Sequence, residues 1–219
     1  MASVRISALL EPFLAAPLSS IQLKSISIYI DMLLRWNRKL SLTAVRDPDS
    51  VVTRHFGESL FAAQRLFLPS SPVPRLQLVD VGSGAGFPGL PIKICVPELS
   101  VILIEANHKK AAFLREVIRA LTLKGVDVFL GRAEDFAPHS AGIVTMRAVE
   151  RFERALPVAA RLVRPGGLLA LLIGESQVQT AAQVLPGFSW QASIPVPCST
   201  ARVLLVGRQP TPGLQTSES

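Results

Sequence analysis

Apolar residues follow two different periodicities along the chain. Over roughly the first 70 residues they recur at helical spacing, with Ile26, Ile30 and Leu33 on one face of one segment. Val52 and Phe56 begin a similar face on a second segment, and the run LPSSPVP then ends the pattern. We expect residues 1–70 to form an N-terminal helical layer that belongs to the same domain as the rest of the chain.

From residue 76 onward, short apolar runs alternate with helical stretches. The strand-like runs are LQLVDV, VILIEA, VDVFLG, GIVTMR, LLALLIG, WQASIPV and ARVLLVG. Helical stretches fall between most of them, at 90–96, 108–124, 150–163 and 177–185. Continuous apolar strands separated by helices are typical of a parallel sheet that is covered on both faces. No clear helix separates the last two runs, so we expect them to form a hairpin at one edge of the sheet.

Seven strands that end in a hairpin match the doubly wound, Rossmann-like sheet of class I S-adenosylmethionine-dependent methyltransferases. A chain of 219 residues is long enough for one such α/β core and too short for two ordinary domains with linkers. We expect the core to occupy residues 71–208. Residues 209–219, with the sequence QPTPGLQTSES, are predicted to form a disordered tail.

Composition adds a preference for an anionic partner. The formal net charge is +7 and the pI is about 10.1, which favours nucleic acid or an anionic membrane surface. Lys and Arg cluster at 35–54, 109–124 and 147–164, although any one cluster alone could be an ordinary solvated helix face. A content of 49% hydrophobic and 18% charged residues excludes a disordered chain.

Cysteines and apolar runs indicate the compartment. Cys95 and Cys198 are the only cysteines, so the sequence predicts neither a disulfide framework nor a metal site. Glu11 and Pro12 break the N-terminal apolar run before it resembles a signal peptide, and no run elsewhere reaches membrane-spanning length. We expect a cytoplasmic protein without a membrane partner, and nothing in the sequence demands more than a monomer.

The stretch LVDVGSGAGFPGLP follows the first predicted strand and has the composition of a ligand-binding loop. In an open α/β sheet, ligands bind beyond the carboxyl ends of the strands. Gly82, Gly84 and Gly86 allow positive φ values and a close approach of the backbone to a ligand. We therefore expect these three glycines to contact a bound cofactor.

Two cofactor classes compete for this loop. Gly84, Gly86 and Gly89 satisfy G-x-G-x-x-G, with Glu105 near the offset of a ribose-binding acid, so a dinucleotide is formally possible. That pattern starts too late, however, and Asp80 stands where a dinucleotide site normally has an apolar residue. S-adenosylmethionine fits better, with Asp80 facing the cationic amino-acid end of the cofactor directly or through water.

Acidic residues also end the next two predicted strands. A carboxylate at Glu105 can accept both ribose hydroxyls of an adenosine, and the backbone of Ala133 with Glu134 or Asp135 could recognise adenine. Each acid alone could instead cap a helix. Three acids at the ends of three successive strands favour the cofactor.

The segment after the fourth predicted strand bears on the methyl acceptor. It reads TMRAVE and lacks the Asn-Pro-Pro-aromatic motif that is common in enzymes methylating exocyclic amines. Cys198 lies far from the predicted ligand edge and is a poor candidate for a thiolate nucleophile. No general base is evident. A ring nitrogen such as guanine N7 needs none, because it already has an unprotonated lone pair, and positioning would supply most of the catalysis.

Several segments together resemble the RsmG (GidB) family of small-subunit ribosomal RNA guanine-N7 methyltransferases. The resemblance covers nearly the whole chain in the family's order. The matching segments are WNRKLSLTAVRDP (36–48), RHFGESL (54–60), VDVGSGAGFPGLP (79–91), KKAAFLREV (109–117), RAEDF (132–136) and MRAV (146–149).

This resemblance implies methylation of N7 on one guanine in the decoding-region loop of 16S rRNA, with S-adenosylmethionine as the cofactor. The family's cofactor contacts fall on Gly82, Phe87, Ala133, Glu134 and Arg147. Of these, Arg147 could also orient the base or its phosphate, and a structural ion pair with a nearby acid is the alternative. The substrate would be 16S rRNA or the small ribosomal subunit, and the sequence does not decide between them.

The N-terminal matches suggest contacts with RNA. Asn37, Arg46 and His55 could border the base pocket, although an ion pair with Asp47 or Asp49 is an equally good interpretation for Arg46. Trp36 could stack on an unpaired base, but a helical tryptophan more often belongs to the core.

The chain departs from the family pattern at several positions. Gly57 and Glu58 stand where Leu-Asp is common, Ser41 replaces an Asn, and Ile173 replaces a Lys before Gly174. Two alternatives stay open at this point: a small-molecule methyltransferase with an apolar pocket, and an inactive RNA-binding relative.

Overall fold

The computed structural model describes residues 1–67, 76–148 and 151–211. An eight-stranded sheet forms its centre. The strands run in the order β3 (Val126–Leu130), β2 (Ser100–Glu105), β1 (Gln77–Val81), β4 (Ala141–Arg147), β5 (Val163–Gly174), β8 (Arg202–Arg208) and β6 (Ser189–Trp190), and β7 (Ile194–Pro195) also pairs with β8. The first five are parallel, and β8 is antiparallel to β5. The strand order reverses between β1 and β4, where a doubly wound sheet binds its ligand.

The edge of the sheet differs from the prediction in one respect. WQASIPV was expected to form one strand, but it forms two short strands, β6 and β7, both antiparallel to β8. Trp190 pairs with Gly207 and Ile194 pairs with Leu204. The edge segment therefore advances by four residues over a stretch in which β8 advances by three. The extra residue is a bulge that interrupts the ladder, and the sheet therefore has eight strands and not seven. The predicted antiparallel edge itself is confirmed.

The N-terminal layer consists of helices and short helical turns. They are α1 (Ser3–Leu10), η1 (Glu11–Phe13), α2 (Ser20–Asn37), α3 (Pro48–Val51), η2 (Val52–Gly57) and α4 (Glu58–Leu66). Ser19 and Gln22 form a capping box that starts α2. The second predicted helix is in three pieces because η2 is a π-helical turn, a widening that simple helical periodicity does not reveal.

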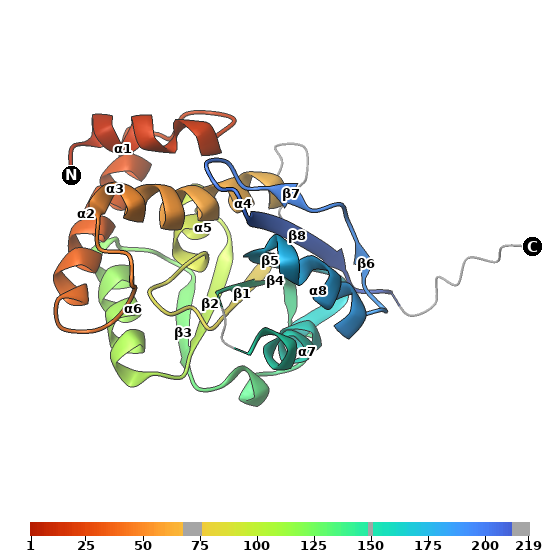
Figure 1. Cartoon of the computed structure of the whole chain (residues 1–219). Helices are drawn as coiled ribbons and strands as arrows, with labels where there is room; N and C mark the ends of the chain where they lie inside the picture. Colours follow the sequence, from red (N-terminus) through yellow and green to blue (C-terminus); the bar gives the residue numbers. More distant parts are fainter. Residues whose placement is uncertain (68–75, 149–150, 212–219) are drawn as a thin grey trace, which may run out of the picture.

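Helices cover both faces of the sheet, as Figure 1 shows. One face carries α5 (Gly89–Cys95) and α6 (His108–Ala120), with α2 and α4 packed over them and α3 beside α2. The other face carries α7 (Phe152–Leu162) and α8 (Val178–Val184). The short turns η3 (Ala133–Asp135) and η4 (Glu175–Gln177) follow β3 and β5. The predicted helix 108–124 starts at the observed first residue of α6, and the start predicted at residue 150 lies outside the described residues. The other predicted helix ends differ from the observed ends by one to four residues.

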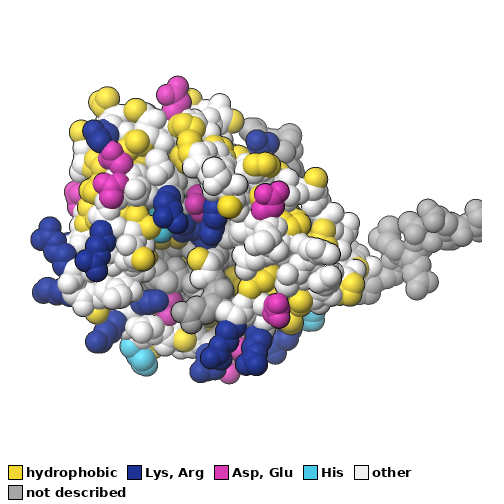
Figure 2. All heavy atoms as spheres, in the orientation of Figure 1, with side chains coloured by type: hydrophobic (Ala, Val, Ile, Leu, Met, Phe, Trp, Pro, Cys, Tyr) yellow, Lys and Arg dark blue, Asp and Glu magenta, His cyan; other side chains and the backbone are white. Residues whose placement is uncertain are grey.

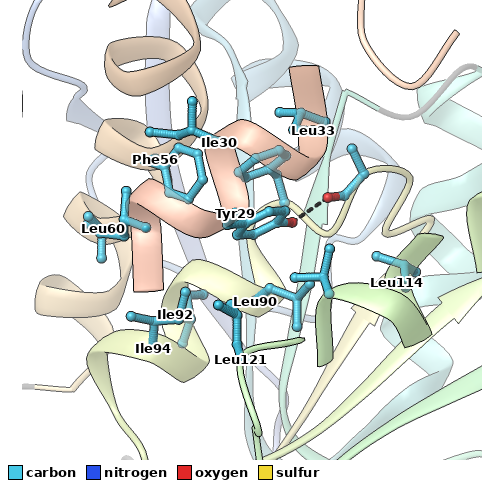
Figure 3. Packing of buried hydrophobic residues seen from close by; sticks show 14 of the residues in the cluster. Tyr29, Ile30, Leu33, Phe56, Leu60, Leu90, Ile92, Ile94, Leu114 and Leu121 are labelled. Carbon is cyan, nitrogen blue, oxygen red and sulfur yellow. Dashed lines mark hydrogen bonds between the residues drawn. The ribbon is translucent and has the colours of Figure 1, made fainter. Parts of the chain in front are cut away.

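The N-terminal layer and one face of the sheet share a hydrophobic core. Tyr29 of α2 and Phe56 of η2 are fully buried beside Leu90 of α5 and Leu114 of α6 (Figure 3). The rings of Tyr29 and Phe56 meet edge to face, with centroids 5.1 Å apart. Burying an aromatic ring of this size contributes a few kcal/mol, so the layer and the sheet stabilise each other.

Parts of the predicted layer and tail lie outside the described residues, namely 68–70 and 212–219. Within the described tail, the Gln209 amide donates a hydrogen bond to the carbonyl of Gly167 at 2.9 Å, so this residue continues the sheet. Among the helices described, none is long and apolar enough to cross a membrane.

Candidate active site

A glycine-rich loop leaves β1 at the point where the strand order reverses. Gly82 and Gly84 have φ values of +66° and +57°, which disfavour any residue with a side chain. A Cβ on Gly84 would have only the Gly82 carbonyl oxygen near it, at 3.8 Å. The backbone at Gly84 therefore faces open space, as expected for a loop that a ligand approaches.

Gly86 has a different role from the one the sequence suggested. Its φ is +94°, but a Cβ there would overlap the Tyr29 hydroxyl and lie 2.6 Å from Cδ1 of Leu90. The Tyr29 hydroxyl donates a hydrogen bond to the carbonyl of Ala85, drawn dashed in Figure 3. Gly86 thus allows α2 to approach the loop closely from behind, and it does not line the open side. The prediction that Gly86 contacts the cofactor finds no support in this placement.

Asp80 lies beneath the loop, fully buried. Its Oδ1 accepts a hydrogen bond from Oγ1 of Thr145 at 2.8 Å, and its Oδ2 accepts one from the Gly89 amide at 3.3 Å. Burial raises the pKa of this carboxyl from 3.8 to about 6. Asp80 thus joins β1, β4 and the start of α5 in the interior, and the expectation that it faces the cofactor directly or through water stays a prediction.

Glu105 ends β2 and holds the loop in place. Its Oε2 accepts a hydrogen bond from the Gly84 amide at 2.8 Å, and its Oε1 accepts one from the Asn107 amide at 2.8 Å. The residue is 8% exposed. Each carboxylate oxygen retains a second lone pair, so the predicted acceptance of ribose hydroxyls is compatible with this geometry and stays a prediction.

Ala133 and Glu134 lie at the end of the neighbouring strand β3, in the turn η3. Ala133 is buried and Glu134 is exposed. Their carbonyl oxygens both accept hydrogen bonds from Nη2 of Arg161 on α7. Their amide groups and the Glu134 carboxylate are not used in those bonds, and their predicted contact with adenine stays a prediction.

Arg147 ends β4 and is held in place by Glu58. The two side chains are only 9% and 5% exposed, and Nη2 of Arg147 lies 3.1 Å from Oε2 of Glu58. The same oxygen accepts a hydrogen bond from Nη2 of Arg202 at 3.3 Å. Nη2 of Arg147 also donates to the Arg54 carbonyl at 2.6 Å. The structural ion pair that the sequence left open is therefore present. Nη1 of Arg147 has no hydrogen-bond partner in the described part of the chain, so Arg147 can also bind a ligand.

His55 connects Arg147 to a threonine. Nδ1 of His55 lies 3.0 Å from Nη2 of Arg147, and its Nε2 lies 2.7 Å from Oγ1 of Thr43. Its ring stacks on Phe87, with centroids 4.8 Å apart. Burial and the nearby positive charge of Arg147 lower the pKa of His55 to about 3, so the imidazole is neutral near pH 7.

These groups surround an open cleft of about 280 Å³. It is lined by Leu42, Thr43, His55, Gly82, Ser83, Gly84, Ala85, Phe87, Lys110, Arg147 and Ala148. The structure thus gathers four of the predicted residues, Gly82, Gly84, Phe87 and Arg147, with His55. A larger hollow of about 710 Å³ beside α1 has Glu11 as its single ionisable lining residue, so it offers little chemistry.

Asn37 and Arg46, two of the three predicted RNA contacts, are placed differently from each other in the structure. The side chain of Asn37 donates to the Thr43 carbonyl at 2.9 Å and accepts from the amides of Leu42 and Thr43, so it fixes the loop after α2. Arg46 is exposed. Among the described residues it pairs with neither predicted acid, because Asp47 caps α3 and Asp49 pairs with Arg5.

Three residues that shape the site were not singled out from the sequence. Thr43 lies within the quoted segment WNRKLSLTAVRDP, and Glu58 was noted only as a departure, although an acid there can balance Arg147. Tyr29 gave no signal beyond helical periodicity. Among the described residues, no group of three or more His, Cys, Asp and Glu side chains could hold a metal ion.

Comparison with known proteins agrees with this geometry. The sequence profile of the family described as "rRNA small subunit methyltransferase G" (GidB) matches residues 22–191. The chain belongs to this family. It is 40% identical over 167 residues to the ribosomal RNA small subunit methyltransferase G of Desulfitobacterium hafniense, an alignment that covers 74% of the chain and 66% of that relative. The protein of the same name from Streptococcus pneumoniae is 37% identical over 161 residues, covering 71% of the chain and 67% of that relative.

The GidB chain also shares its fold with solved methyltransferases. A SAM-dependent methyltransferase from Aquifex aeolicus superimposes with a TM-score of 0.58 at 16% identity, covering 77% of the chain and 96% of that structure. The ribosomal protein L11 methylase of Lactobacillus delbrueckii gives 0.58 at 13% identity, covering 71% and 79%. The predicted class I methyltransferase fold and the predicted family are thus both confirmed.

Proposed function

We propose that this chain transfers the methyl group of S-adenosylmethionine to N7 of one guanine in the decoding-region loop of 16S rRNA. The observation that carries the proposal is the loop from Gly82 to Ala85. In this member of the GidB family, the loop lines an open cleft at the point where the strand order of the sheet reverses. The carboxylate of Glu105 holds the backbone of the loop in place. The SAM dependence named for the Aquifex aeolicus structure supports the choice of cofactor.

The residues present fit this cofactor. The space beside the backbone of Gly84 is open, so a ligand can approach there. A side chain at this position would occupy that space. Gly82, Gly84 and Phe87 would hold its methionine and sulfonium portion, and Glu105, Ala133 and Glu134 would hold its adenosine. When bound, S-adenosylmethionine supplies an electrophilic methyl group on a positively charged sulfur.

The cleft favours an acceptor that brings its own lone pair. His55 uses its only basic nitrogen to accept from Arg147, and no carboxylate is among the described residues that line the cleft. The described lining therefore offers no free general base. Guanine N7 needs none: its lone pair forms the new N–C bond, the S–C pair stays on sulfur as a neutral thioether, and the positive charge passes to the base without loss of a proton. The role of Arg147, as proposed, is to orient the base or its phosphate, with His55 beside it.

Cationic residues extend from the cleft across the surface of α2 and α6. Lys110 lines the cleft, and next to it Lys109 lines a groove of about 440 Å³ together with Arg35, Trp36, Lys39, Leu40 and Ala112. Figure 2 shows Lys and Arg side chains gathered over these helices at the left. Positive charge beside a half-buried tryptophan suits RNA phosphates and unpaired bases. We infer that 16S rRNA, as such or in the small subunit, docks here on a cytoplasmic monomer.

The alternatives fit the cleft less well. A small-molecule methyltransferase would have an enclosed apolar pocket, whereas this cleft is open and contains Lys110, Arg147 and His55. An inactive RNA-binding relative would have lost cofactor affinity. Titration calorimetry with S-adenosylmethionine tests that directly, and we expect binding by the wild-type chain.

A paired substitution sharpens this measurement. Gly84→Val places a side chain into the open cleft and is expected to abolish cofactor binding. Gly125→Val is the matched control, because Gly125 also has a positive φ, +66°, and a Cβ there meets no atom closer than 3.7 Å. Equal affinity of both variants would contradict the proposed cofactor site.

The substrate is tested with a labelled methyl donor and small ribosomal subunits, 16S rRNA or tRNA that lack the modification. Label on N7 of one guanine of 16S rRNA is the expected result. Label on an adenine, a cytosine or tRNA would overturn the substrate assignment while leaving the methyltransferase assignment intact.

A further inference from the structure

A chain of hydrogen bonds runs from the interior of the protein to a threonine at the cleft. Glu58 holds the guanidinium of Arg147 with a 3.1 Å contact, Arg147 reaches Nδ1 of His55 at 3.0 Å, and His55 reaches Oγ1 of Thr43 at 2.7 Å. The middle members are nearly excluded from water, since the Arg147 side chain is 9% exposed and His55 is 8% exposed.

The direction of each bond in this chain is fixed. A guanidinium can only donate, so Nδ1 of His55 must be the acceptor and carries no proton. The neutral imidazole therefore has its proton on Nε2 and donates it to Oγ1 of Thr43. The amide of Val45 donates to the same oxygen at 3.1 Å. Two donors occupy the two lone pairs of Oγ1, which leaves the hydroxyl proton of Thr43 for a third partner.

This arrangement changes what a threonine can recognise. A free hydroxyl both donates and accepts, so it does not distinguish a carbonyl from an amino group. With both lone pairs filled, Thr43 can only donate. Guanine presents two acceptors, N7 and O6, on its Hoogsteen edge, whereas adenine presents an amino group in place of O6. Two donors that face each other are unfavourable, so a hydroxyl that can only donate discriminates against adenine.

We propose that Thr43 donates a hydrogen bond to O6 of the target guanine, and that Glu58, Arg147 and His55 position it for this role. The assignment rests on the function proposed above. Because O6 is adjacent to N7 on the base, a donor to O6 places N7 and leaves its lone pair free for methylation.

The experiment pairs a protein substitution with a base substitution. Small subunits are reconstituted with 16S rRNA carrying either guanine or 2-aminopurine, which lacks O6 but keeps N7, at the methylated position. Thr43→Val removes the hydroxyl at nearly constant shape, and Thr43→Ser keeps it. On guanine, we expect Thr43→Val to lower kcat/KM about ten- to a hundredfold and Thr43→Ser to stay near wild type. On 2-aminopurine, wild type and Thr43→Val should be equal.

Two further measurements make the result specific. The affinity for the two RNAs, measured without methyl donor, should show the same dependence on the hydroxyl and O6. The calorimetric affinity for S-adenosylmethionine should be unchanged in Thr43→Val. If that substitution prevents folding, judged by circular dichroism, Thr43→Ala replaces it.

Three outcomes would overturn the assignment. An equal loss on both RNAs would mean that Thr43 does not contact O6. A parallel loss of S-adenosylmethionine affinity would assign the hydroxyl to the cofactor. If the wild-type chain labels no guanine N7, the proposed function fails together with this assignment, and that failure is visible before any variant is made.

Discussion

Two buried ionisable residues at the site respond to pH in opposite directions. Asp80 has its pKa raised to about 6 by burial, so between pH 4 and 6 the folded chain holds more protons there than the unfolded chain. Its contribution to the free energy of unfolding therefore falls as pH rises through this window. His55 has its pKa lowered to about 3, so the folded chain holds fewer protons, and its contribution rises with pH up to about 6.5.

Single substitutions are expected to separate these two effects. Asp80→Asn removes the falling contribution, so its free energy of unfolding should rise more steeply between pH 4 and 6 than that of wild type. His55→Gln should show the opposite change in slope. Each difference across the window is about 2 kcal/mol. Urea unfolding midpoints at several pH values measure both.

The control for this series is Gln183→Ala, which changes an exposed side chain on α8 and removes no ionisable group. Its profile should run parallel to that of wild type. If all three variants gave parallel profiles, neither buried residue would couple to folding in the way that its surroundings indicate.

At the scale of elements, Gly57 and Phe13 explain one departure from the family pattern. A Cβ on Gly57 would lie 2.7 Å from two atoms of the Phe13 ring, which is 3% exposed. The aromatic ring of Phe13 in η1 therefore occupies the space that a side chain at position 57, the end of η2, would need. Within the N-terminal layer, this contact joins η1 to the segment that carries His55 and Glu58.

A double-mutant cycle tests the contact between the two elements. Gly57→Ala alone should lower the free energy of unfolding by about 1–3 kcal/mol, because the added methyl overlaps the ring. In a Phe13→Ala background the space is open, and the same change should be neutral or stabilising. Gly187→Ala, which meets no neighbour, is the control. Additive losses in urea unfolding would show that the two residues do not contact each other.

The pattern of elements was largely predictable, and the exceptions have local physical causes. The apolar runs identified the parallel strands and the antiparallel edge correctly, because strands buried on both faces require continuous apolar sequence. The bulge between β6 and β7 and the π-turn η2 each add a residue to a regular repeat. Such insertions depend on tertiary pairing, as with Trp190 against Gly207, and leave little trace in the sequence.

The site was predictable in its backbone and less so in its side chains. Gly82 and Gly84 lie where the motif placed them, because positive φ values restrict a position to glycine. Asp80 and Asn37 were expected to face ligands, but they bond groups of the protein itself. A sequence shows which residues can form hydrogen bonds, whereas the partner they find depends on the fold. Thr43 was missed for the same reason, since its restriction to donating arises only from His55 and Val45 together.

At the scale of the whole molecule, the Lys and Arg side chains that line the cleft and the groove beside it predict salt-dependent binding of RNA. Lys39→Glu and Lys109→Glu should each weaken the affinity for small subunits or 16S rRNA. Each should also lower the slope of log Kd against log salt concentration by about one, the amount expected for the loss of one phosphate contact. Cofactor affinity should be unchanged. Filter binding over a series of salt concentrations measures the effect.

Lys24→Glu is the matched control, because Lys24 is exposed on α2, the helix that ends just before Lys39, but lies outside the lining of the groove. It changes the net charge by the same amount. If it weakened binding as much as Lys39→Glu, overall charge and not the groove would account for the affinity.

The bond between Tyr29 and the glycine loop has a consequence for the chain during its synthesis. The helical layer leaves the ribosome before the glycine loop, α5 and α6, which complete the burial of its aromatic face. Until then Tyr29 and Phe56 have each other but lack Phe87 and the later helices, and their rings are exposed to aggregation or chaperones. A nascent chain arrested before β2 would therefore be prone to aggregate and unable to bind a ligand. Once α6 has been released, the aromatic rings can be buried and the glycine loop can take its folded conformation together.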